Sequence, residues 1–296
     1  MTPELRKTPF GSLTATSLHY PGSGTPVHFH HANGFGAACY HPFLSGLAPH
    51  YSVAALNMRP LWPNVPAPNK GRGWEQYGDD LITWIEATQS APILAIAHSM
   101  GAATTAMAAV KRPDLFQGLV LIEPAGVTHR LYRFMRLLPY ALRRRLDPAH
   151  SVFHRRNHWH DRDELYTELR AIRAYKRFSD DDLQSLVNAM TTPDTNGFRL
   201  AFPPLWEAHN YVMPPHILPV LKRLTVPTRV IAAKPSIFVN PVILDGLRTA
   251  RPDIPFTDLP AHGHLLPLEA PEPAAKATLD ALTLLQSDLP SVTTAA

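Results

Sequence analysis

Cysteine, long apolar runs and a strong charge of either sign are scarce in this chain, and each scarcity excludes a class of protein. The one cysteine, Cys39, excludes an internal disulfide framework and is typical of a reducing compartment such as the cytoplasm. No stretch approaches the roughly 18 apolar residues of a membrane span, and residues 1–7 lack the apolar run of a signal peptide. The net charge of +4 is too small to indicate nucleic-acid binding, and no motif for it is present.

Metal-ligand spacing is lacking as well. His28, His30, His31 and His41 lie close in the sequence, but no acidic or thiol partner accompanies them at ligand spacing. Successive residues of a strand also point to opposite faces, which separates neighbouring imidazoles. We expect no metal site and no cofactor.

Short apolar runs alternate with helical patterns toward both ends of the 296 residues. This alternation predicts an α/β fold with a mostly parallel central sheet and helices on both faces. The predicted strands are residues 27–30, 52–56, 93–97, 119–122, 228–232 and 254–259. The predicted helices are residues 74–88, 102–111, 241–250 and 273–286.

The middle of the chain has a different pattern. Residues 130–146, 162–178 and 181–190 carry apolar residues at three- and four-residue intervals, without a strand signal. We therefore predict a helical cap over residues 127–215, inserted between two parts of the core, residues 1–126 and 216–286. The small, polar residues 287–296 are expected to form a flexible tail.

A serine stands at a predicted strand-turn-helix corner. The run Ala97-His98-Ser99-Met100-Gly101 follows an apolar strand and opens a helix rich in small residues. Such a corner lifts a serine hydroxyl above the sheet edge, where a base and a substrate carbonyl both reach it. Ala97 departs from the usual Gly-x-Ser-x-Gly pattern, and its single methyl is the mildest departure. We predict Ser99 as a nucleophile.

A serine nucleophile needs a base, and His264 is the best candidate. It lies in a loop after the last predicted strand, where an imidazole reaches the carboxyl ends of the strands. His262 is a competitor, but Gly263 directly before His264 gives the loop its conformational freedom.

Three motifs in this order resemble the α/β-hydrolase fold family. They are His31-Ala32-Asn33-Gly34-Phe35, the Ser99 corner, and Gly263-His264 followed by Glu269-Ala270-Pro271-Glu272. The resemblance covers residues 10–286 and implies the nucleophile-acid-histidine order of that family. Its members hydrolyse esters, amides, lactones, epoxides or carbon–halogen bonds. Ser99 argues against the last two, because those relatives use an aspartate nucleophile.

The resemblance leaves the acid of the triad in an unusual place. Many members carry an aspartate after the strand that corresponds to residues 229–232, but Ser236 stands near that position here. Glu123 ends the preceding strand, and many haloalkane dehalogenases take their acid from that place. We predict Glu123 as the acid, with Asp245 and Asp258 as alternatives.

The resemblance also predicts an oxyanion hole. One backbone N–H comes from Met100, directly after the nucleophile and at a helix N-terminus. The other comes from Asn33, by alignment with the His-Gly-x-Pro pattern of the family, and Gly34 is an alternative one residue away.

The cap has a basic first part. Eight arginines between Arg130 and Arg156 are interleaved with apolar residues, and acids follow at residues 161–164 and 180–182. One interpretation is a surface for anionic substrates or lipid headgroups. We favour the other, an amphipathic helix with its apolar face on the core and solvated arginines that pair with those acids.

Aromatic and apolar residues are expected near the mouth of the pocket. Trp62 replaces the glycines that many relatives have in its loop, so it either walls the site or covers the core. A capped, mostly apolar pocket suits a small to medium substrate with little charge. The candidates are Phe35, Trp62, Phe202, Trp206, Tyr211 and Met213.

Together these features predict a cytoplasmic, cofactor-independent serine hydrolase that cleaves a carboxylic ester through an acyl-enzyme. A lactonase, thioesterase, lipase or carbon–carbon bond hydrolase would use the same triad. A small-molecule receptor of the same fold is the rival from another class. The expected partner is a small-molecule substrate, and the oligomeric state is left open.

Overall fold

An eight-stranded sheet organises the molecule, in a computed structural model that describes residues 2–89, 92–234, 236 and 241–288. Its strand order is β1-β2-β4-β3-β5-β6-β10-β11. β2 is antiparallel to both of its neighbours, and the other neighbouring pairs are parallel. The strands are β1 (Glu4–Phe10), β2 (Leu13–Tyr20), β3 (Pro26–His30), β4 (Ser52–Leu56), β5 (Ile93–His98), β6 (Phe116–Ile122), β10 (Thr228–Lys234) and β11 (Phe256–Pro260).

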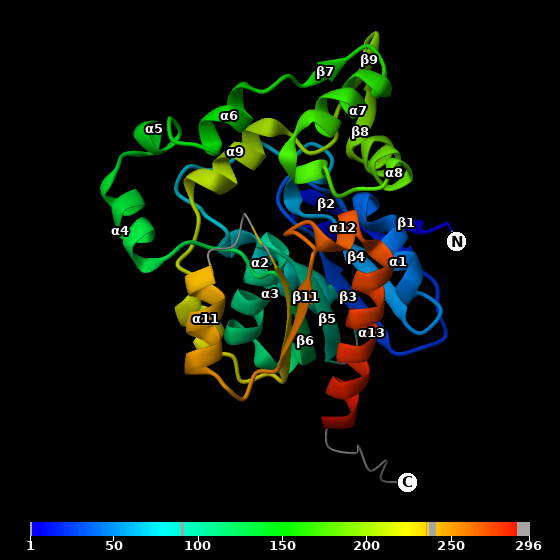
Figure 1. Cartoon of the computed structure of the whole chain (residues 1–296), viewed down its shortest axis with the longest axis vertical. Coiled ribbons are helices and arrows are strands. Elements are labelled where there is room, and N and C mark those ends of the chain that lie inside the picture. Colours follow the sequence, from blue (N-terminus) through cyan, green and yellow to red (C-terminus); the bar gives the residue numbers. More distant parts are fainter. Residues whose placement is uncertain (1, 90–91, 235, 237–240, 289–296) are drawn as a thin grey trace.

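Helices cover both faces of this sheet (Figure 1). One face carries α1 (His41–Leu47), α12 (Leu266–Glu269) and α13 (Pro271–Asp288). The other carries α2 (Glu75–Thr88), α3 (Met100–Lys111), α10 (Leu218–Lys222) and α11 (Pro241–Ala250). β5 is buried along its whole length, because Leu94 and Ile96 face the first layer while Ala95 and Ala97 face the second. The predicted α/β class is confirmed.

Between β6 and β10 the chain forms a cap above one end of the sheet, drawn in green to yellow in Figure 1. Its helices are α4 (His129–Leu137), α5 (Tyr140–Arg143), α6 (Ala149–His154), α7 (Arg162–Ala171), α8 (Asp180–Met190) and α9 (Pro204–Val212). Its strands are β7 (His158–Trp159), β8 (Thr191–Asp194) and β9 (Gly197–Leu200), in a separate sheet of order β7-β9-β8. Short 3₁₀ turns are η1 (Ala37–Tyr40), η2 (Arg59–Leu61), η3 (Pro113–Leu115) and η4 (Arg173–Tyr175).

Several predictions about elements were wrong. The cap is not all-helical, because strands of two to four residues are too short to show a two-residue periodicity. The single helix expected over residues 130–146 is divided between α4 and α5, since Leu138 and Pro139 take extended backbone conformations. β1 and β2 were not predicted.

The C-terminal helix is longer than expected. Ser287 and Asp288 belong to α13 rather than to the predicted tail, and residues 289–296 lie outside the described residues. Within the part of the chain that the structure describes, no helix combines the length and hydropathy needed to cross a membrane.

Candidate active site

Ser99 lies at the corner between β5 and α3, at the carboxyl end of the central strands. Its φ of 56° and ψ of −116° are strained for a residue with a side chain. The corner needs a glycine at 101, because a Cβ there would lie 2.3 Å from the carbonyl oxygen of His30. Ala97 is fully buried in β5, which accepts its methyl. The hydroxyl of Ser99 is thus held by the fold above the sheet edge.

His264 and Glu123 complete a chain of hydrogen bonds from this hydroxyl. The Nε2 atom of His264 is 2.8 Å from Ser99 Oγ, and its Nδ1 atom is 3.2 Å from Glu123 Oε2. A carboxylate only accepts, so Nδ1 carries the proton and Nε2 accepts from the serine hydroxyl. Ser99, His264 and Glu123 are all buried, with 7%, 6% and 0% exposure. The structure therefore brings together the three residues predicted to form the triad.

Glu123 is held by the strand beside it. It follows β6 with a φ of 50°, and its backbone N–H donates to the carbonyl oxygen of Ile231 at 2.9 Å. The backbone N–H of Ala233 donates to Oε1 at 2.7 Å, leaving Oε2 for the histidine. Ala233 belongs to β10, after which the acid of many relatives comes, so the neighbouring strand still supports the acid site here.

The alternative residues take other places. Asp258 forms an ion pair with Arg248, and Asp245 is exposed on α11. Ser236 is half-buried beyond the end of β10. His262 is half-buried in the loop, and it is His264 that contacts Ser99.

The loop after β3 faces the cap through the side chain of Asn33. Its Nδ2 donates to the carbonyl oxygen of Glu207 at 3.2 Å, and its Oδ1 accepts from Asn210 Nδ2 at 2.8 Å. Tyr77 in turn donates to Asn210 Oδ1. The amide side chain of Asn33 is thus engaged with α9. Met100 is the first residue of α3, so its backbone N–H has no acceptor within the helix.

Gly34 lies directly against a partly buried ion pair of the cap. Its φ is +81°, and a Cβ there would lie 2.8 Å from the carboxylate carbon of Glu207. Glu207 accepts from Arg155, with an Nη2–Oε2 distance of 2.5 Å. Burial raises the pKa of Glu207, and the guanidinium of Arg155 opposes this rise. The cap therefore closes over the predicted oxyanion loop with a charged pair.

A second hydrogen-bond chain runs beneath the site and was not predicted. The Ala32 N–H donates to the Tyr40 hydroxyl, which lies 2.8 Å from His98 Nδ1, and His98 Nε2 lies 2.7 Å from the carbonyl oxygen of His264. The carbonyl accepts, so His98 is protonated at Nε2 and accepts at Nδ1. Burial holds the pKa of His98 well below its usual range. This neutral imidazole links the oxyanion loop to the loop of His264.

Comparison with known proteins decides the family. The model of the alpha/beta hydrolase family matches residues 29–277. This chain belongs to that family. It is 22% identical over 278 residues to 2-(acetamidomethylene)succinate hydrolase of Mesorhizobium japonicum, with 92% of each protein covered.

Solved structures share the fold of this hydrolase. A crystal structure of E-2-(acetamidomethylene)succinate hydrolase matches with a TM-score of 0.79 and 20% identity, covering 95% of this chain and 99% of that one. The thioesterase domain from the curacin biosynthetic pathway matches with a TM-score of 0.76 and 18% identity, covering 95% and 100%. At these identities the likeness establishes the fold.

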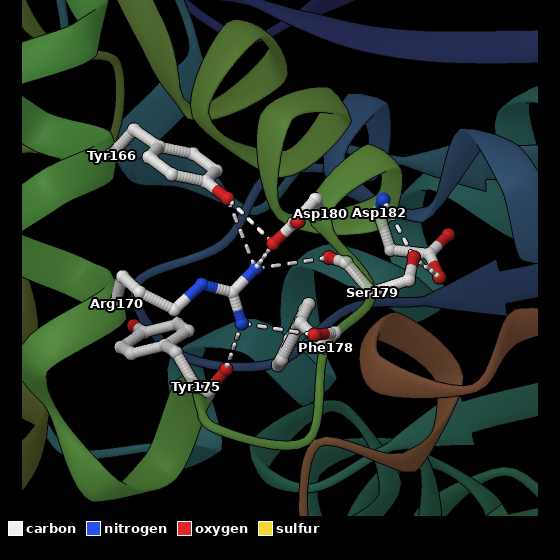
Figure 2. A network of polar contacts seen from close by, with 7 residues as sticks. All are labelled: Tyr166, Arg170, Tyr175, Phe178, Ser179, Asp180 and Asp182. Atoms are coloured by element: carbon white, nitrogen blue, oxygen red, sulfur yellow. Dashed lines mark hydrogen bonds and ion pairs between the residues drawn. The ribbon is translucent and has the colours of Figure 1, made fainter.

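Arg170 holds the loop that joins α7 to α8 through a network of polar contacts (Figure 2). Its guanidinium donates to the carbonyl oxygens of Tyr175 at 3.3 Å and Phe178 at 2.9 Å, and it pairs with Asp180 at 2.6 Å. Within the loop, the guanidinium of Arg177 lies 3.0 Å from where a Cβ on Gly263 would stand. The network therefore keeps this loop against the segment that carries His264.

The loop also brings a phenol toward the charged pair. Burial raises the pKa of Tyr175, and the charge of Glu207 raises it further. The pKa of Tyr211 on α9 is raised by the same two causes, and a hydrogen bond from Asn33 opposes the shift. Tyr211 was a predicted pocket residue, whereas Tyr175, Arg155 and Glu207 were not. These four residues come from segments that are separate in the sequence, so no local pattern groups them.

The other predicted pocket residues lie in different surroundings. Phe35 is half-buried beside Gly34 in the oxyanion loop. Trp62 is buried, packs on Phe10 at a ring distance of 4.8 Å, and donates from Nε1 to the carbonyl oxygen of Asn57. Together with Trp206 of α9 it borders a groove between the loop of residues 60–67 and the cap. Trp62 therefore covers part of the core.

The sequence predicts that the four clustered histidines form no metal site. His28, His30 and His31 are buried, and His41 lies at the start of α1. His31 Nε2 accepts from the backbone N–H of Met58 at 2.8 Å. Among the residues that the structure describes, no three histidine, cysteine or acidic side chains form a group that would hold a metal ion.

Proposed function

We propose that this protein is a serine hydrolase that cleaves an acyl bond, in the first place a carboxylic ester, through an acyl-enzyme. The observation that carries the proposal is the buried series Ser99–His264–Glu123, with hydrogen bonds of 2.8 and 3.2 Å. Hydrogen bonds thus join the residues that we propose as nucleophile, base and orienting acid.

The proposed reaction begins with proton transfer. Ser99 Oγ attacks the substrate carbonyl and its proton passes to His264 Nε2. The imidazolium is stabilised by Glu123 across Nδ1–H. His264 then protonates the leaving group, which departs as the acyl-enzyme forms. Water, deprotonated by the same imidazole, attacks the acyl-enzyme, and the acid product leaves as Ser99 regains its proton.

Each attack on the carbonyl carbon gives a tetrahedral intermediate with a negatively charged oxygen. We propose that the backbone N–H groups of Asn33 and Met100 stabilise this oxyanion. Support comes from the engagement of the Asn33 side chain with Glu207 and Asn210, which orients the loop and leaves its backbone as the donor. The N-terminus of α3 adds its dipole at Met100. We propose Phe35, beside this loop, as a contact of the substrate.

An amide bond in a carboxylate-bearing substrate is the second candidate. The observation that favours it is the Arg155–Glu207 ion pair, which lies against Gly34 and brings charge where the sequence predicted an apolar pocket. The relative from Mesorhizobium japonicum is named as the hydrolase of a succinate derivative that contains an acetamido group.

Cys39, buried and unpaired, supports the proposed cytoplasmic location.

Labelling with a fluorophosphonate probe tests the nucleophile. We expect labelling of the wild-type protein and none of Ser99→Ala, with the added mass on the peptide that contains Ser99. A folded wild-type protein that is not labelled would favour a binding module of the same fold. A panel of esters and matched N-acyl amides, each with and without a carboxylate, then separates the two candidates by kcat/KM.

A further inference from the structure

Half of the exposed large apolar side chains of this protein lie in one short stretch. We call residues 129–146, which span α4 and α5, the arginine–leucine segment. Leu131, Phe134, Leu137, Leu142 and Leu146 are exposed there, out of ten such side chains in the described residues. Leu137 is 83% exposed and Phe134 51%. Soluble surfaces rarely gather so many apolar side chains, and such patches mark interaction sites.

The apolar face of α4 points away from the core. Met135 is buried and Tyr132 is half-buried on its inner side, near His216. Leu131, Phe134 and Leu137, spaced by three residues, form an exposed stripe on the other side. The sequence-based preference for an inward apolar face was therefore wrong. Periodicity predicts two faces of a helix but not which one the fold covers.

The charge of this segment is of one sign. It contains six arginines and no aspartate or glutamate. In the part of the chain that the structure describes, none of these six guanidinium groups forms an ion pair with a carboxylate. Among the acids expected to pair with the arginines of the cap, Glu164 pairs with Arg156, and Asp180 pairs with Arg170. Both arginines lie beyond the segment, whose own guanidinium groups have no ion-pair partner among the described residues; Glu75 lines the same cavity as Arg136 and Arg143.

Its position leaves the segment accessible. Figure 1 shows α4 and α5 at the outer end of the cap, away from α7 and α8. Leu138 and Pro139 join the two helices. The long alkyl part of an arginine lets its guanidinium group stay in water while neighbouring leucines are buried in an apolar environment.

We propose that the arginine–leucine segment docks on an anionic lipid bilayer, with the apolar stripe in the interface and the arginines among the headgroups. An interfacial helix combines these two features, and a planar bilayer needs no shape-matched groove. A second copy of this chain fits less well, because it would bring two arginine-rich surfaces together. Nucleic acid would leave the leucines uncovered. The proposal does not depend on the reaction at Ser99, and it places the cap of the hydrolase at a membrane surface.

Flotation with vesicles tests this docking. We expect association with vesicles of phosphatidylcholine and phosphatidylserine at low salt, weakening as salt rises, and little with phosphatidylcholine alone. Arg133→Gln should weaken binding about fivefold, the equivalent of about 1 kcal/mol per basic residue at the surface. Leu137→Asp should weaken it on the order of tenfold to a hundredfold.

Two matched variants serve as controls. Leu284→Asp changes a leucine of α13 that is 49% exposed, and Arg223→Gln removes an exposed arginine after α10. Both should bind vesicles as the wild type does. All four variants should keep the wild-type melting temperature and turnover of a water-soluble substrate, because none of the changed residues touches the site.

Three results would overturn the proposal. One is the absence of binding to anionic vesicles at low salt, and another is equal binding by Leu137→Asp and the wild type. The third is self-association in vesicle-free sedimentation velocity that Leu137→Asp abolishes. That result would assign the segment to contact between copies of this chain.

Discussion

The imidazole of His98 donates a hydrogen bond to the backbone carbonyl of His264 at 2.7 Å, so the residue before Ser99 holds the loop that carries His264. The two rings lie 5.2 Å apart. Burial keeps the pKa of His98 well below its usual range, so this donor stays neutral during the proton transfers that we propose for His264. In the proposed mechanism, proton transfer at Ser99 therefore takes place beside an imidazole that does not compete for the proton.

Tyr40→Phe should loosen this arrangement. The hydroxyl accepts from the Ala32 N–H and donates to His98, so its removal leaves two buried polar groups without a partner. We expect the free energy of unfolding to fall by about 1–3 kcal/mol. We also expect kcat to fall roughly tenfold with little change in KM, since the base and the oxyanion loop lose a shared support. Urea titration and steady-state kinetics measure the two effects.

Tyr20→Phe is the matched control for that variant. Tyr20 is equally buried, but its hydroxyl contacts only His41, at 3.3 Å, among the described residues. Its kcat should equal that of the wild type. Equal kcat values for the two variants would show that the Tyr40–His98 chain has no part in positioning.

Glu123→Gln tests the unusual place of the acid. The amide keeps the shape of the side chain but does not stabilise an imidazolium, and its NH2 group can force the wrong tautomer on His264. We expect kcat/KM to fall by roughly 10³-fold or more, as it does when the orienting carboxylate of a triad is lost. Asp258→Asn, which changes the exposed partner of Arg248, should stay near wild-type activity. A larger loss of kcat/KM in Asp258→Asn than in Glu123→Gln would reject Glu123 as the acid.

Local patterns in the sequence were enough to predict the sheet and the three residues now found in contact. The apolar run of β5, the small residues of α3 and the glycine before His264 are each readable within a few positions. The chain from Ala32 to His264 is not readable in this way, since His98 and His264 are 166 residues apart. Only the folded sheet shows that a histidine beside the nucleophile meets that carbonyl.

The cap was harder to predict for related reasons. β7 has two residues, and β8 and β9 have four each, which is too short to show a two-residue periodicity. These strands form because they pair with one another in the folded cap. The ion pair of Arg155 and Glu207 depends on α6 and α9 meeting beside the loop after β3. Eight arginines lie between Arg130 and Arg156, and nothing in the local sequence shows that one of them is held by a buried carboxylate.

Gly34→Ala should damage the oxyanion loop. The new methyl group would lie about 3 Å from the carboxylate of Glu207, in a left-handed conformation that disfavours alanine. We expect the loop to shift and kcat to fall at least roughly tenfold. Gly11→Ala provides the comparison, because its φ is +57° but nothing lies within 4 Å of the added carbon. That variant should lose about 1 kcal/mol of stability and keep its kcat. An unchanged kcat in Gly34→Ala would show that contact with the cap does not set the loop.

Stability should fall as the pH falls below about 6.5, because buried histidines cannot be protonated in the folded state. Burial lowers the pKa of His28 to about 3 and that of His31 to about 4. Between these values and the usual pKa near 6.5, the unfolded chain binds protons that the folded chain does not, so unfolding becomes easier as the pH falls. Each histidine should contribute about 1.4 kcal/mol per pH unit within this window, and the pair about 3 kcal/mol per unit.

His28→Leu isolates one of these contributions. Among the described residues, neither ring nitrogen of His28 has a hydrogen-bond partner at normal geometry, and the ring packs against Trp84 at 5.1 Å. A leucine should therefore leave the protein at least as stable at pH 7, and it should reduce the slope between pH 6 and pH 4 by about 1.4 kcal/mol per unit. His160→Leu, at a side chain that is 84% exposed, should leave the slope unchanged. Urea titrations across this pH range measure the slopes, and a wild-type slope in His28→Leu would mean that His28 is protonated in the folded protein.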